Sequence, residues 1–205
     1  MEAVAAPSSR TFDLSVVRDG GRQPVGTLTE TVGRTLDGRL VRVQRLTSPR
    51  GSQVDSLVSR PDLAPVSHYS RNRGRIVDLR FASGAVTGTY TNAGEAPVAV
   101  DDDTGGPAFD SNVVDLVARA VPLVPGFSAD VRTYERASAD ATDTDVTYSV
   151  RVVGRGAVGD REATVVEFSK AGTGATRLYL DPETREVLRQ ESDVAPGTTF
   201  VMEPS

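Results

Sequence analysis

The chain has 205 residues, of which 38% are hydrophobic and 25% charged, and its formal net charge is −5. This composition is typical of a globular domain, and the acidic balance argues against a nucleic-acid-binding surface. The absence of cysteine excludes disulfides, thiolate nucleophiles and cysteine-ligated metal sites. No apolar run approaches the roughly 18 residues that a transmembrane segment needs.

The first ten residues, MEAVAAPSSR, differ in composition from the rest of the chain. They contain no basic segment followed by an apolar one, so no signal peptide is expected in this sequence. We predict that residues 1–10 are a flexible lead and that residues 11–205 form a single β-rich domain.

Most of the remaining chain alternates between apolar and polar residues, as in Phe12, Leu14 and Val16, which is the pattern of half-buried strands. Asp37-Gly38 and Ser83-Gly84 favour tight hairpin turns. Gly88, in mid-strand, indicates a bulge, a bend or the close approach of another group. Strands are predicted at 11–18, 25–32, 40–46, 53–60, 66–71, 75–82, 85–91, 97–100, 129–135, 145–153, 162–169, 176–180, 186–191 and 198–202.

One stretch, residues 110–121, has the period of an amphipathic helix instead. Asp110 or Ser111 can cap its first turn, and Pro122 cannot extend it. Asp115 and Arg119 are expected to pair weakly on the face opposite the apolar stripe. A helix of about three turns is not stable alone in water, so it must pack on the sheet. The predicted fold is therefore mainly β: a strongly curved antiparallel sheet, or a partly open barrel, of about twelve short strands with this helix packed across it.

Four segments in order resemble a bacterial family. They are VDSLVSRPDLAPVSHYS at 54–70, FASGAVTGTY at 81–90, FDSNVVDLVARAVPLVPGFSADV at 109–131 and TRLYLDPETREVLRQE at 176–191. The sequence is similar to the domain-of-unknown-function family numbered 3108 and its relatives, which are exported β-rich proteins. The resemblance implies a β-rich fold and an extracytoplasmic setting, periplasmic or secreted. It supplies no established activity and no catalytic residues.

His68 is the only histidine in the chain. With Ser70, on the same face of its strand, it suggests a hydrolase as the alternative function, since imidazole titrates near neutral pH. No G-x-S-x-G motif raises a serine onto a sharp turn. A solvent-facing strand histidine is the simpler interpretation, and we predict no catalytic residues.

The middle of the chain is locally basic, with arginines at positions 60, 71, 73, 75 and 80. Guanidinium groups there could hold an anionic headgroup, although Arg71, Arg73 and Arg75 are more simply explained as a solvated turn. The helix stripe with Leu123 and Phe127 either closes over a cavity or completes a packed core, and the sequence leaves both open. The candidate ligand-binding residues are Arg60, His68, Arg80, Tyr90, Leu123 and Phe127.

Two acidic stretches, Asp101–Asp103 and the loop with Asp140, Asp143 and Asp145, do not match the spacing of a known calcium loop. We therefore expect no metal site and no cofactor, and calcium binding stays open. The predicted function is that of a non-enzymatic exported envelope protein which binds an apolar or lipid-like ligand or a protein partner in the envelope.

Overall fold

A computed structural model describes residues 7–142 and 144–205. The described residues form a single sheet of 15 strands, in the order β8-β7-β6-β5-β4-β3-β2-β1-β15-β14-β13-β12-β11-β10-β9. Every neighbouring pair is antiparallel except β9 and β10, which are parallel. The strands are β1 Ser8–Arg18, β2 Gly21–Arg34, β3 Leu40–Ser48, β4 Gly51–Ser59, β5 Pro65–Asn72, β6 Arg75–Ala82, β7 Ala85–Thr91, β8 Val98–Asp103, β9 Phe109–Asp110, β10 Ser128–Tyr134, β11 Asp145–Val158, β12 Arg161–Lys170, β13 Thr176–Leu180, β14 Val187–Ala195 and β15 Thr198–Pro204.

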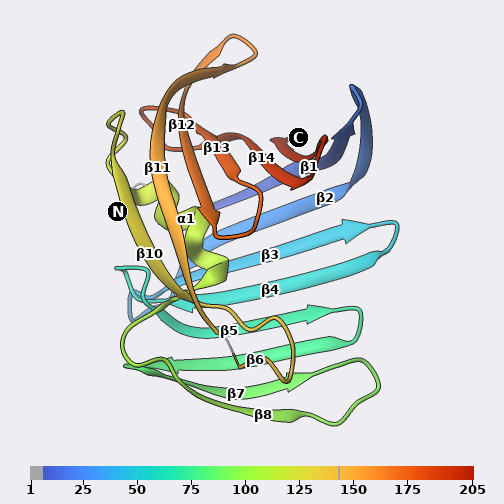
Figure 1. Ribbon diagram of the computed structural model, residues 1–205, viewed down its shortest axis with the longest axis vertical. Helices are drawn as coiled ribbons and strands as arrows, with labels where there is room; N and C mark the ends of the chain where they lie inside the picture. Colours follow the sequence, from blue (N-terminus) through green and yellow to red (C-terminus); the bar gives the residue numbers. More distant parts are fainter. Residues whose placement is uncertain (1–6, 143) are drawn as a thin grey trace.

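The sheet has two edges, β8 and β9, and bends so that its two halves face each other. In Figure 1, β3–β8 run across the lower half, β10–β13 stand steeply in the upper half, and the helical segment lies between them. That segment is a 3-10 turn, Ser111–Val113, followed by α1, Val114–Ala120. No helix in the described part of the chain has the length and apolar character needed to cross a membrane.

The prediction of a mainly β, largely antiparallel sheet with one helix is confirmed, and β6, β7 and β13 have the predicted bounds. The predicted number of strands was too low, and the two-residue β9 escaped prediction because it is too short to show a period. The predicted flexible lead lies partly outside the described residues, and its last three residues, Ser8–Arg10, belong to β1. The helix is shorter than expected because its first turn is a 3-10 turn capped by Asp110, whose side chain accepts from the Asn112 N–H at 2.8 Å.

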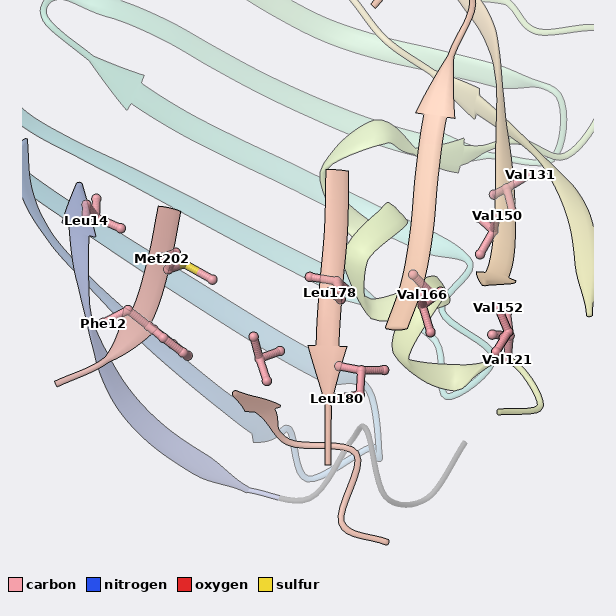
Figure 2. Close-up of a cluster of buried hydrophobic side chains, with 12 residues drawn as sticks. Phe12, Leu14, Val121, Val131, Val150, Val152, Val166, Leu178, Leu180 and Met202 are labelled. Carbon is pink, nitrogen blue, oxygen red and sulfur yellow. The ribbon is translucent and has the colours of Figure 1, made fainter. Parts of the chain in front are cut away.

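The largest apolar cluster lies between α1 and the sheet, as Figure 2 shows. Leu178 and Leu180 from β13 and Val166 from β12 are fully buried in it. Phe12, Leu14 and Met202 continue it toward β1 and β15. Complete burial of a Leu or Val side chain stabilises the fold by about 1.5–3 kcal/mol, so this cluster holds the short helix in place.

Gly88 of β7 lies in very close contact with the backbone of β6. Its φ is +146°, and a Cβ there would lie 2.0 Å from the Asp78 carbonyl oxygen. Close approach of another group, one of the three readings of this glycine, is therefore confirmed. Only a residue without a side chain fits this position.

Candidate functional site

Three adjoining cavities follow the inner face of the sheet. The first, which we call the His68 cavity, has a volume of about 230 Å³, and the second, the central cavity, about 320 Å³. They share Gln53 and Asp55 of β4 in their walls. The third, the rim groove, has a volume of about 550 Å³ and shares Leu14, Leu46 and Phe200 with the central cavity. The shared lining residues show that the three cavities adjoin one another, and together we call them the recess.

The central cavity is enclosed by both halves of the sheet. Leu28 and Leu46 face it from β2 and β3, where they are direct cross-strand partners. Phe168 of β12 and Phe200 of β15 face it from the other half. All four side chains are only half-buried. The apolar interior is thus densely packed where α1 lies on the sheet, and it contains the central cavity where these four side chains lie.

A buried ion cluster closes the helical end of this cavity. Arg42 of β3 is only 4% exposed, and its guanidinium donates two bonds to the Asp115 carboxylate, at 2.8 and 2.6 Å, and one to Glu30, at 2.8 Å. Arg119 reaches the second Glu30 oxygen at 3.3 Å. Burial alone would raise the pKa of Glu30, but the charges of Arg42 and Arg119 outweigh it and hold that pKa below 4.5.

These contacts correct the expectation for the helix surface. Asp115 and Arg119 do not pair with each other across one turn. Asp115 pairs with Arg42 and Arg119 pairs with Glu30, and the Arg119 side chain is buried. The cluster therefore ties α1 to β2 and β3.

His68 is also placed differently from the expectation. It is 7% exposed rather than solvent-facing, and its Nδ1 lies 2.9 Å from Asp110 Oδ2. Nε2 lies 3.8 Å from Asp55 Oδ1, an ion-pair distance. Burial alone would lower the pKa of His68, but the two carboxylates outweigh it and raise the pKa to about 9. Near neutral pH the imidazole is therefore a cation that links β5 to the sheet edge at β9.

This arrangement does not suit the hydrolase alternative. A general base must have a free lone pair, and a protonated imidazole has none. Nδ1 of His68 lies at hydrogen-bond distance from Asp110, whereas Nε2 has no hydrogen-bond partner among the described residues. Ser70 is buried on the same face of β5 as His68 and is the cross-strand partner of Asp55 on β4. Burial alone would raise the pKa of the Asp55 carboxyl, but the polar groups around it, His68 first among them, lower it. The geometry is that of a buried ion triad and not of a nucleophile with its base.

The other predicted ligand-binding residues are dispersed. Arg60 pairs with Asp62 at 3.4 Å in a turn, and Arg80 pairs with Asp78; all four side chains are largely exposed. Tyr90 is buried, and its hydroxyl donates to the Ala137 carbonyl at 3.2 Å.

Leu123 lines a separate cavity of about 200 Å³, and Phe127 packs against the main apolar cluster. Of the six predicted residues, only His68 lines the recess. The sequence prediction missed Leu14, Leu28, Leu46, Phe168 and Phe200. Their period of two indicates the inner face, but it does not show which part of that face stays uncovered.

The acidic stretches are occupied by ion pairs. Asp102 accepts from the Tyr134 hydroxyl and from Arg136, each at 2.6 Å, and so joins β8 to the β10 side of the sheet. Asp145 pairs with Arg132 at 2.8 Å, and Asp143 lies outside the described residues. Within residues 7–142 and 144–205, no group of three or more His, Cys, Asp or Glu side chains has an arrangement that could hold a metal ion.

Known proteins support the fold and assign no activity. No curated protein matches the sequence. A β-barrel-like protein of the domain of unknown function DUF1849 from Brucella abortus has a similar structure, with a TM-score of 0.64 and 11% identity over 97% of this chain and 95% of that one.

Two further structures show a weaker likeness, from which we draw no argument. The Pseudomonas aeruginosa MucA/MucB complex gives a TM-score of 0.37 at 16% identity, over 99% of this chain and 52% of that one. A DUF1329 family protein from Desulfovibrio piger gives 0.37 at 8% identity, over 100% and 86%. The family profile described as "Protein of unknown function (DUF3108)" matches residues 11–203, and the chain belongs to this family.

Proposed function

We propose that this protein is a non-enzymatic binding protein that holds an apolar or lipid-like molecule in the central cavity and the rim groove. The observation that carries the proposal is the pair of adjoining cavities, the central cavity and the rim groove, with half-buried leucine and phenylalanine side chains in their walls. Binding sites for small molecules are typically clefts of about 300–1,000 Å³ with mainly apolar walls and a few polar groups. The volumes of about 320 and 550 Å³ fall in this range.

The polar groups of the recess support binding rather than catalysis. Gln53 and Asp55 separate the central cavity from the His68 cavity, and the Gln53 amide donates to Asp55 at 2.5 Å. His68, the only histidine, is held as a cation by two carboxylates. The proposed setting is extracytoplasmic, in keeping with the exported family that the sequence resembles.

The test uses a neutral fluorophore, N-phenylnaphthylamine, which becomes bright in apolar surroundings. Leu46 faces both the central cavity and the rim groove, so Leu46→Trp should fill the recess. We expect saturable binding to the wild-type protein and a loss of affinity of about tenfold or more in Leu46→Trp, equivalent to about 1.4 kcal/mol.

The matched control is Val153→Trp. Val153 is 52% exposed on β11 and lines none of the three cavities. This variant should bind the fluorophore as the wild-type protein does. Absence of saturable binding to the wild type, or equal binding by both tryptophan variants, would refute the proposed site.

A further inference from the structure

We propose that the ligand is a long-chain anion, with its apolar chain in the recess and its carboxylate or phosphate at Arg50 and Arg73 on the rim. This inference rests on the proposed function and deepens it, because it names the chemical class of the ligand. It starts from the uneven distribution of charge around the rim groove. Among the residues that the structure describes, Arg50 and Arg73 are the only charged side chains that line this groove, and no carboxylate lines it.

The walls of the rim groove are otherwise mainly apolar. Val16 of β1 and Phe200 of β15 are cross-strand partners that face it together, and Val25 of β2 and Leu46 of β3 face it from the neighbouring strands. Val25 and Leu46 are half-buried. An alkyl chain in contact with these side chains removes apolar surface from water, at about 25 cal/mol per Å².

The two arginines lie at one end of this apolar surface. Arg50 is in the turn between β3 and β4, and Arg73 is in the turn between β5 and β6. Both turns lie on the same side of the sheet, at the right of Figure 1. A Cβ built on Gly51, next to Arg50, would lie 4.0 Å from Arg73 Cγ, so the two turns are neighbours. Two guanidinium groups can therefore reach one headgroup.

Neither arginine has a carboxylate partner among the described residues, and both are exposed. Most arginines of this acidic chain do have such partners, as the pairs Arg39–Asp37 and Arg132–Asp145 illustrate. Each guanidinium has five N–H donors in a planar fork, which fits carboxylate and phosphate oxygens. A cationic amphiphile would meet two like charges here, and an uncharged one would leave both forks unused.

The three arginines around the turn between β5 and β6 lie in different surroundings. Arg71, Arg73 and Arg75 were most simply explained as one solvated turn, and Arg71 and Arg73 are indeed exposed. The structure separates their roles: Arg73 lines the rim groove, while Arg75 lines the His68 cavity. Arg71 alternates with His68 and Ser70 along β5, so it lies on the outer face of the sheet.

The experiment measures how four amphiphiles, each with a chain of twelve carbons, displace N-phenylnaphthylamine, each below its micelle concentration. They are dodecanoate, dodecyl phosphate, dodecanol and dodecyltrimethylammonium. We expect the wild-type protein to bind the two anions about tenfold more tightly than the alcohol, and the cation most weakly. Comparison of dodecanoate with dodecyl phosphate shows which anionic headgroup fits better.

The test variant is Arg50→Gln combined with Arg73→Gln. It should lose the preference for the anions and keep its affinity for dodecanol. The control is Arg45→Gln combined with Arg71→Gln, which removes the same charge from exposed side chains on β3 and β5 and should keep the preference. Since all four positions are exposed, both proteins should fold.

The outcomes separate this inference from the function on which it rests. Equal affinity of the wild type for dodecanol and the anions, or equal loss of anion affinity in both double variants, would overturn the assignment of Arg50 and Arg73 while the binding groove stands. Failure of every amphiphile to displace the fluorophore would refute the groove itself.

Discussion

Replacement of His68 by Gln should change how the stability of this protein depends on pH. His68 is the only histidine and the chain has no cysteine, so few other groups titrate between pH 6.5 and 9. The pKa of His68 is raised from 6.5 to about 9 because Asp110 and Asp55 outweigh the opposite effect of burial. The folded protein therefore holds this proton more tightly than the unfolded chain does.

The direction of the pH dependence follows from the linkage between proton binding and folding. A raised folded-state pKa adds stability that is fully present below pH 6.5 and is lost as the pH rises through about 9. At about 1.4 kcal/mol for each pH unit, the difference between the two pKa values corresponds to at most about 3.5 kcal/mol. The arginines Arg75 and Arg136 and the carboxylate Glu135 line the same cavity as His68.

The assay is urea denaturation at pH 6, 7, 8 and 9.5, with the free energy of unfolding compared between the wild type and His68→Gln. The wild type should lose about 2–3 kcal/mol more than the variant between the lowest and highest pH, and the difference should appear mainly above pH 6.5. Parallel curves for the two proteins would show that the imidazole is not a buried cation and would refute the ion triad.

Two further substitutions test the interior. Gly88→Ala should lower the free energy of unfolding by about 3 kcal/mol or more, because the new Cβ meets the Asp78 carbonyl oxygen. The control in the same urea assay is Gly33→Ala on β2. This position has open space around it, so the change in stability should be less than about 0.5 kcal/mol. Similar losses in the two alanine variants would contradict the close packing of β6 on β7. Arg42→Met should cost about 3–5 kcal/mol, because it leaves the buried Glu30 and Asp115 carboxylates without this cation. Arg39→Met, which breaks an exposed pair, should cost less than about 1 kcal/mol, and equal costs for the two methionine variants would rule out the buried cluster.

The amino-acid sequence determined the local structure of this protein. Alternation with a period of two located strands such as β6, β7 and β13 to the residue, since the inward side chains of a strand recur at every second position. Asp110 was one of two candidate caps, with Ser111, because short polar side chains accept from the free N–H groups of a first turn, and the structure shows that Asp110 is the cap. Ordered segments along the chain were also enough to indicate its family.

The tertiary structure decided which inward side chains are covered and which charges meet. His68 and Asp110 are brought together only because the sheet bends until its β9 edge reaches β5, and no local pattern encodes such a contact. The same bend brings Arg42 to Asp115 and leaves Leu46, which packs at the edge of the main apolar cluster, in the wall of the central cavity. A period of two defines the faces of a strand, whereas burial, ion pairing and cavities depend on the distance between elements that are far apart in sequence.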